Sequence, residues 1–111
     1  MAGGEVTNLV FVSSQNGKAV KLEEELRKLA RSSRSEPGSL IYEVHQSASD
    51  RSEFFLYGIW RSQEDLEAHM KAGAIQEFLG SASELVDGAL NFRLFAPIDV
   101  VRIRPRDSHS V

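Results

Sequence analysis

The chain has 111 residues, of which 41% are hydrophobic and 26% charged, and its formal net charge is -3. This length allows one domain with a single core, and no apolar stretch approaches the roughly 20 residues that a membrane-spanning helix needs. The absence of cysteine excludes disulfides and thiolate chemistry. Scattered Lys and Arg give no basic stripe for nucleic acid, and MAGGEV at the N-terminus has no signal-peptide character. We therefore expect a cytoplasmic protein that binds no nucleic acid and no membrane.

A strand and then a helix are predicted in the first third of the chain. The run VTNLVFV, Val6 to Val12, is nearly all apolar or β-branched, which is typical of a strand covered on both faces. Asn8 is its one strongly polar residue. After Gly17 the apolar residues return at helical spacing, and a polar stretch from Ser32 to Ser35 indicates where this helix ends. The residues that mark the apolar face of the helix are Ala19, Leu22, Leu26 and Leu29.

Two further strands are predicted in the middle of the chain. Pro37-Gly38 is a turn signal, and a strand begins at about Ser39 with Leu40, Tyr42 and Val44 expected on one face. The polar stretch SASDRSE, 47–53, has the length and composition of a hairpin loop, and an aromatic run that ends at Trp60 follows it. The two strands should therefore pair antiparallel.

The last third of the chain predicts two helices and a final strand. Ser62 is placed to cap a helix, with acidic residues in its first turn, and Gly73 interrupts the helical pattern. A second amphipathic segment follows, ending at Asp87-Gly88, and LNFRLFAP, 90–97, reads as a strand.

The element order β-α-β-β-α-α-β is the ferredoxin-like split βαβ plan, an α+β fold with an antiparallel sheet and its helices on one face. The other sheet face should also be apolar, because alternation along the strands leaves hydrophobic residues on both sides. A symmetric homodimer, a dimeric α+β barrel packed sheet against sheet, is the simplest cover for that face. We expect a single domain over 1–111 with its core at about 5–104. The β-prone segment 98–105 is expected to reach the partner, and the tail 105–111 to be disordered.

Three segments together resemble the antibiotic biosynthesis monooxygenase domain family. They are EPGSLIYEVHQ at 36–46, the strand that ends at Trp60, and the run WRSQEDLEAHM at 60–70 with IQEF after it. The resemblance covers about Val6 to Pro97. It implies a dimeric ferredoxin-like protein with a pocket between sheet and helices, and, for members that are enzymes, monooxygenation of quinols and aromatic polyketides with neither metal nor flavin. Relatives isomerise small phosphorylated dicarbonyls or degrade haem.

The chain departs from this family at two positions. Many members carry a second histidine five residues after the one that matches His69, and here Ala74 stands in that place. The axial histidine of the haem-degrading relatives would fall near Leu79, which cannot ligate iron. The first departure leaves the histidine pair incomplete, and the second disfavours haem degradation.

Histidine is the candidate base, because its unperturbed titration lies near neutral pH. His69 is the first candidate, although it shares a helix face with Leu66 and Met70 and is alternatively a buried structural histidine. His45 is the second, near a strand end where it is alternatively part of a dimer rim. The three histidines lie in distant segments, with His109 in the tail, and no metal-ligand spacing is present, so no metal site is predicted.

Four residues are candidates for substrate binding. Trp60 is suited to stack on a planar substrate, and Asn8 to hydrogen-bond an oxyanion or phenol. Tyr42 is suited to donate to a quinol oxygen, and Arg93 to bind an anionic group. Each has a structural alternative. Trp60 is alternatively a core residue, Asn8 an amide hydrogen-bonded to backbone, and Tyr42 a packing residue. Arg93 alternatively forms a salt bridge to Glu43 or across the dimer.

The sequence therefore leads to a cofactor-independent monooxygenase that oxidises a quinol, phenol or enolisable aromatic with dioxygen. An isomerase of a small dicarbonyl compound is the enzymatic alternative and would favour a polar, cationic pocket. A non-catalytic small-molecule-binding or stress-response module is the third interpretation. A cavity filled by its own side chains, with Trp60 and His69 packed solid, would favour that module.

Overall fold

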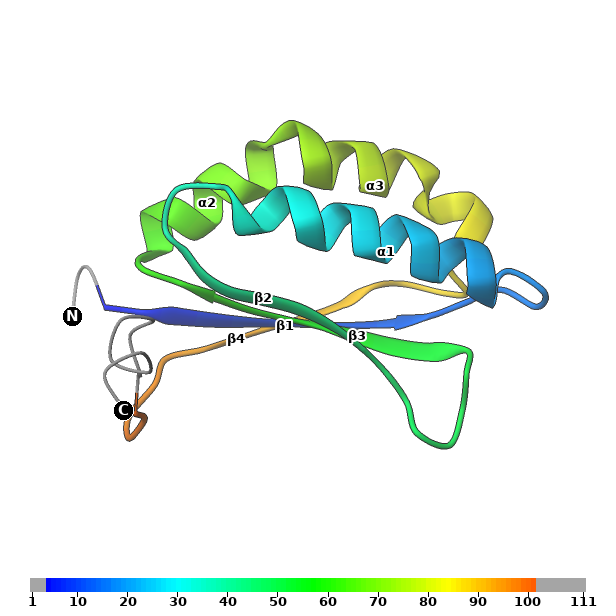
Figure 1. The fold of residues 1–111 in the computed structure, drawn as a ribbon, viewed down its shortest axis with the longest axis horizontal. Coiled ribbons are helices and arrows are strands. Elements are labelled where there is room, and N and C mark those ends of the chain that lie inside the picture. The colour runs from blue at the N-terminus through cyan, green and yellow to red at the C-terminus, as the bar shows by residue number, and fades with distance from the viewer. Residues whose placement is uncertain (1–3, 102–111) are drawn as a thin grey trace, which may run out of the picture.

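The computed structural model describes residues 4–101, which form a four-stranded sheet and three helices in two layers (Figure 1). The elements in chain order are β1 Val6–Ser13, α1 Ala19–Arg34, β2 Ser39–Gln46, β3 Glu53–Trp60, α2 Gln63–Lys71, α3 Gly73–Leu85 and β4 Asn91–Phe95.

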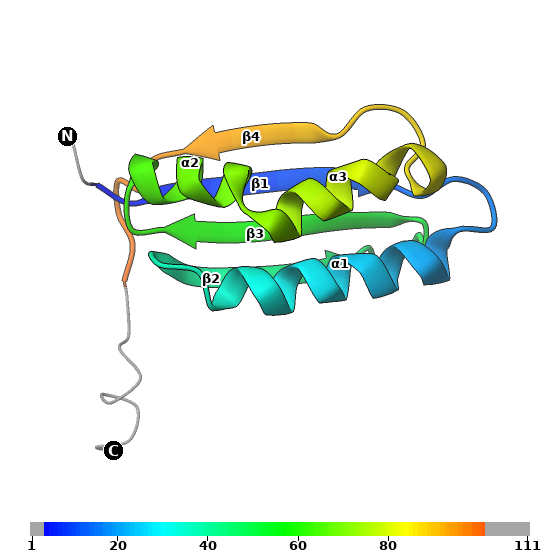
Figure 2. The ribbon, with the colours of Figure 1, turned by 90° about the horizontal axis from the view of Figure 1, so that it is seen from above.

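The sheet is fully antiparallel with the strand order β2-β3-β1-β4. Strands β1 and β3 are therefore central, and β2 and β4 are the edges (Figure 2). The predicted hairpin joins β2 to β3, and helical connections carry the chain across the sheet elsewhere. This arrangement confirms the predicted ferredoxin-like α+β fold.

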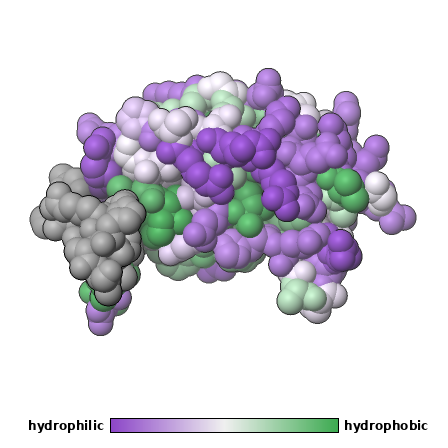
Figure 3. Space-filling view, in the orientation of Figure 1, coloured by the Kyte–Doolittle hydropathy of each residue, from purple (hydrophilic) through white to green (hydrophobic). Residues whose placement is uncertain are grey.

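All three helices cover one face of the sheet, and the core lies between the two layers. The apolar stripe predicted for α1 faces inward, while the outward surface of the helices is mainly hydrophilic in Figure 3. Strand alternation sends even-numbered residues of β1 and β3 into this core. Its central members are Val10, Val12, Leu22, Leu26, Leu29, Phe54, Leu56, Leu66, Ile75 and Phe78.

The turn between α1 and β2 is fastened to the start of α2. Gly38 adopts a positive φ of 83°, and a Cβ there would collide with the Asp65 side chain. The Gly38 carbonyl accepts a hydrogen bond from the Arg61 N–H at 2.8 Å. Ser62 caps α2 as predicted, its Oγ accepting from the Asp65 N–H at 3.2 Å. The segment before β2 is thereby held against the first turn of α2.

Several local features differ from the sequence-based expectation. Helix α3 ends at Leu85 rather than at Asp87-Gly88, and β4 is shorter than the predicted 90–97. A bulge between Ser39 and Ile41 adds one residue, Leu40, to β2 opposite β3. The sequence predicts Leu40 on the same face as Tyr42, but it is 47% exposed, whereas Tyr42 is buried.

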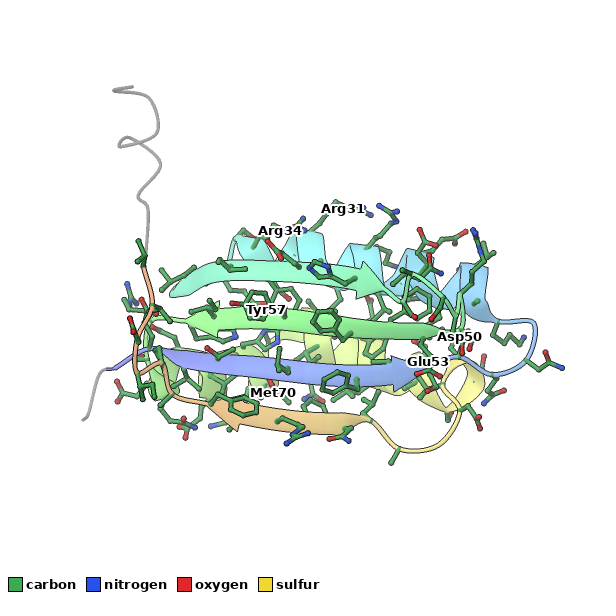
Figure 4. The ribbon with its side chains drawn as sticks, turned by 90° about the horizontal axis from the view of Figure 1, so that it is seen from below. Arg31, Arg34, Asp50, Glu53, Tyr57 and Met70 are labelled. Carbon is green, nitrogen blue, oxygen red and sulfur yellow. The ribbon has the colours of Figure 1, made fainter. Side chains whose placement is uncertain are left out.

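The face of the sheet opposite the helices, called here the outer face, is apolar as the alternation predicts. Phe11 of β1 is 41% exposed and stacks on Phe55 of β3, with ring centroids 5.9 Å apart. Tyr57 is labelled on this face in Figure 4. Its other apolar members are Leu9, Ile41, Ile59 and Phe95.

The chain after β4 is described only as far as Val101. The residues from Ile98 to Val101 form no strand, although the sequence there is β-prone. The rest of the 98–105 segment and the tail 105–111 lie outside the described residues. No helix in the described part of the chain is long and apolar enough to cross a bilayer.

Candidate active site

A buried histidine–carboxylate pair lies between the helices and the sheet. His69 on α2 has a side chain only 1% exposed, and its Nδ1 lies 2.8 Å from Oε1 of Glu36, which follows α1. An ionised carboxylate only accepts hydrogen bonds, so the Nδ1–H donates to Glu36. This bond leaves Nε2 as the free ring nitrogen, and Nε2 is buried without a partner in the described residues. An imidazole oriented in this way by a carboxylate is suited to accept a proton at Nε2.

Two aromatic side chains pack around the imidazole. The Trp60 ring centroid lies 4.6 Å from that of His69, and the Tyr42 ring centroid lies 5.4 Å from it. The two aromatic rings are 6.1 Å apart in an edge-to-face arrangement. Trp60 ends β3 and Tyr42 lies in the middle of β2, and alternation directs both toward the helices. The three rings therefore form a triangle in which His69 packs against both aromatic side chains.

Gly58 makes the close approach of these rings possible. A Cβ at this position would come within 3.0 Å of the Tyr42 ring and 3.1 Å of Trp60 Nε1. Asn8 lies directly opposite Gly58 in the β1–β3 register and is 3% exposed. A glycine in the interior of a strand is typical of such a close approach.

Three unpaired polar atoms lie in this cluster: Asn8 Oδ1, Trp60 Nε1 and His69 Nε2. Buried polar atoms are nearly always hydrogen-bonded, so these three unpaired atoms are candidate partners for a buried water or for the polar groups of a ligand. The indole N–H donates, while the amide oxygen and, in the tautomer above, Nε2 accept. The unpaired atoms of the cluster are therefore one hydrogen-bond donor and two acceptors.

Burial raises the pKa of Tyr42 far above its usual value. The Ser33 hydroxyl lowers the pKa of the phenol, and the Glu36 carboxylate raises it, because a second negative charge beside it is unfavourable. Tyr42 therefore stays protonated and serves as a hydrogen-bond donor rather than as a base.

The structure brings together four of the six candidate residues and separates the other two. Asn8, Tyr42, Trp60 and His69 share the buried cluster. His45 lies on the outer face, where its half-exposed ring is 2.9 Å from Glu43 Oε1 and 4.8 Å from the Phe55 ring centroid.

Arg93 also lies on the outer face, on the edge strand β4. Its guanidinium carbon is 5.7 Å from the centroid of the Phe95 ring. A salt bridge to Glu43 within the chain does not form, because Glu43 is on β2 at the opposite edge of the sheet. The sheet itself separates Arg93 and His45 from His69.

Sequence reasoning missed Glu36 and Gly58. No spacing rule connects Glu36 with His69, since 33 residues separate them. Gly58 carried an available signal, because it interrupts an aromatic strand. At the family's second histidine position, Ala74 packs against the core, and within residues 4–101 no group of three potential ligands could hold a metal ion.

The sequence profile described as "Antibiotic biosynthesis monooxygenase" matches residues 6–81 of the chain. The chain belongs to the antibiotic biosynthesis monooxygenase family. This match confirms the resemblance inferred from the sequence, whereas no curated protein matches the chain.

Solved structures of similar proteins reproduce the fold. The protein PA3566 of Pseudomonas aeruginosa is 26% identical, with a TM-score of 0.82 over 89% of this chain and 99% of that one. A Nitrosomonas europaea protein provisionally named an antibiotic biosynthesis monooxygenase is 20% identical, with a TM-score of 0.82 over 88% and 94%. A Bacteroides thetaiotaomicron protein, named as of unknown function and a possible oxidoreductase, is 25% identical, with a TM-score of 0.79 over 86% and 99%.

Removal of the Tyr42 phenol is expected to change the alkaline stability of the protein. Above about pH 10 tyrosine ionises in the unfolded chain, whereas Tyr42 in the folded chain keeps its proton. The unfolded state then binds fewer protons, so the free energy of unfolding falls as the pH rises through this range. Urea unfolding at increasing pH should show a shallower decline for Tyr42→Phe than for the wild type. Tyr57→Phe, on the outer face, is the control, and equal slopes for wild type and Tyr42→Phe would contradict the assignment.

Proposed function

We propose that this protein is a cofactor-independent monooxygenase of a quinol, phenol or enolisable aromatic. The observation that carries the proposal is the buried His69, whose Nδ1 is bound to Glu36, whose Nε2 is unpaired, and whose ring packs against Trp60 and Tyr42. Membership of the antibiotic biosynthesis monooxygenase family supports it. The name of the Bacteroides relative, a possible oxidoreductase, is in line with it.

In the proposed reaction His69 Nε2 accepts a proton from a ring hydroxyl or an activated methylene group. Glu36 stabilises the imidazolium that results. The substrate anion passes an electron to dioxygen, the two radicals combine at carbon, and the hydroperoxide loses water. For a methylene substrate, one oxygen atom of dioxygen becomes the carbonyl oxygen on that carbon, and the other leaves as water with both methylene hydrogens. The substrate therefore supplies every electron that dioxygen takes up.

The remaining residues of the cluster bind the substrate in this proposal. Trp60 contacts one face of a planar ring, which stacking on an aromatic side chain favours, and Tyr42, edge-to-face to Trp60, contacts the edge of that ring. The Trp60 N–H donates to the oxyanion that develops, and Asn8 Oδ1 accepts from a second hydroxyl. His45 is not assigned the role of base, because its ring is exposed on the outer face.

The tight packing of the same cluster favours a second candidate, a non-catalytic module on this fold. Trp60 is 0% exposed and His69 2%, so their own side chains fill much of the space that a substrate needs. Such a cluster can serve stability alone. The isomerase alternative has less support, because no Lys or Arg side chain contacts His69, Trp60 or Tyr42 among the described contacts, and Arg34 meets only the Tyr42 backbone.

Dioxygen consumption with hydroquinones and anthrone-like phenols tests the proposal. The protein is first treated with chelator and shown to be free of flavin. His69→Gln should lower kcat by at least about 100-fold, the usual contribution of a positioned base. Glu36→Gln should lower kcat more than it raises KM, because it acts through His69. His45→Gln is the matched control and should retain the wild-type rate.

Uptake no faster than autoxidation across the panel would instead support the non-catalytic module. Uptake that survives in His69→Gln would contradict the assignment of the base.

We also infer that the protein is a homodimer packed through its outer face. The centre of this face is apolar, with Leu9, Phe11, Phe55, Tyr57 and Ile59 on the two central strands. The edge strands add polar residues at its rim, Glu43, His45, Asn91 and Arg93, beside the apolar Ile41 and Phe95. An apolar centre with a polar rim is typical of protein interfaces. A cross-dimer ion pair between Glu43 and Arg93 remains part of this proposal.

Sedimentation of two matched variants tests the dimer. Phe11→Glu places a charge at the centre of the outer face and should yield monomers. Phe92→Glu is the control, because Phe92 is similarly exposed at 43% but pairs with Val10 and so lies on the helix side of β4. A monomeric wild type at micromolar concentration, or equal dissociation of both variants, would contradict the inference.

A further inference from the structure

A hollow of about 310 Å³ lies between α1 and the β2 edge of the sheet, apart from the cluster around His69. We propose that this hollow, called here the arginine hollow, binds an organic carboxylate with an apolar body. Its volume is at the lower end of the range for small-molecule sites. Its lining residues are Glu23, Arg27, Ala30, Arg31, Arg34, Val44, Gln46 and Phe54.

Three arginines of α1 form the rim of the arginine hollow. Arg27, Arg31 and Arg34 are four and three residues apart, so they lie on one side of the helix. Figure 4 shows Arg31 and Arg34 projecting from α1 on the side of β2. Arginine side chains that converge at a concave surface attract anions.

The three guanidinium groups differ in how they are already engaged. Arg27 is neutralised by Glu23, with its NH2 nitrogen 2.8 Å from Oε2. Arg34 donates its Nε–H to the Tyr42 carbonyl at 2.9 Å, and this bond orients the guanidinium group. The bond does not use the terminal N–H groups of Arg34. Arg31 forms no ion pair with any residue in the described part of the chain. Two positive charges at the rim are thus uncompensated, and one of them is held in place.

The floor of the arginine hollow is apolar. Ala30 and Phe54 are core residues, and Val44 packs against them from β2. The small side chain of Ala30 leaves space where α1 faces the sheet, and hydrophobic surface appears between the helical layer and the sheet in Figure 3. A ligand that suits this site has an apolar body for the floor and a carboxylate for the rim, which a guanidinium binds with two parallel hydrogen bonds.

The arginine hollow is independent of the two features proposed above. Val44, Gln46 and Phe54 lie on the helix side of the sheet, so a dimer formed through the outer face leaves the hollow open. It does not include His69 or Trp60, so carboxylate binding there is possible whether or not the protein is an oxygenase.

Binding of 2-naphthoate to the full-length protein, measured by calorimetry, tests the proposal. Arg31→Gln removes the unpaired charge from an exposed side chain and should weaken binding by at least about tenfold, the loss expected for one charge-assisted hydrogen bond. Lys28→Gln is the matched control, because it removes the same charge from the same helix at a residue that pairs with Glu25 instead of lining the hollow. The uncharged 2-naphthamide should bind at least about tenfold more weakly than the acid.

Nuclear magnetic resonance locates the bound probe. The Arg31 and Arg34 Nε–H signals should shift with 2-naphthoate, whereas the Trp60 indole signal should not. Failure of 2-naphthoate to bind, undiminished binding to Arg31→Gln, equal loss in Lys28→Gln, or shifts confined to Trp60 would each overturn the proposal.

Discussion

The hydrogen bond between His69 and Glu36 is the interaction on which the account of this protein depends. A buried imidazole without a partner is costly, by about 1–3 kcal/mol for an unsatisfied polar group. Glu36 supplies that partner from a turn 33 residues away, and the Gly38–Arg61 hydrogen bond and the Ser62 cap hold this turn near the start of α2. With the Glu36 carboxylate as acceptor, the same bond places the ring proton on Nδ1 and leaves Nε2 as the acceptor nitrogen.

The sheet separates a buried helix side from a partly exposed outer face. On the helix side, Gly58 lets Tyr42 and Trp60 close around His69, and burial keeps the Tyr42 phenol protonated. On the outer face, aromatic side chains remain partly exposed, and His45 and Arg93 lie on the edge strands. Alternation along β1 and β3 produces both regions, since adjacent residues such as Val10 and Phe11 face opposite sides. The same strands therefore line both the buried cluster around His69 and the apolar outer face.

Much of the fold could be predicted from the sequence, because periodicity reports burial directly. The helical spacing of Leu22, Leu26 and Leu29 and the cap at Ser62 each correspond to an observed element. The bulge at Leu40 could not be predicted, because it depends on how β2 meets β3. Element ends such as Leu85 were also misplaced, since local composition determines them only weakly.

The candidate site was predictable in part. Asn8, Tyr42, Trp60 and His69 could be predicted as site residues from their type and position. Each is a polar or aromatic residue that strand alternation or helical spacing turns inward. Residue type could not distinguish these four residues from His45 and Arg93, because strand register determines which face of the sheet His45 and Arg93 occupy. Glu36 escaped notice because its role arises from a tertiary contact with no sequence pattern.

The measurement that most directly tests this account is the tautomeric state of His69, read from long-range proton–nitrogen correlations of its ring. At a pH at which the ring is neutral, the account predicts a protonated Nδ1 and an unprotonated Nε2, with the Nδ1 signal shifted by Glu36→Gln. A ring protonated at Nε2 instead, or a Nδ1 signal indifferent to Glu36→Gln, would contradict it.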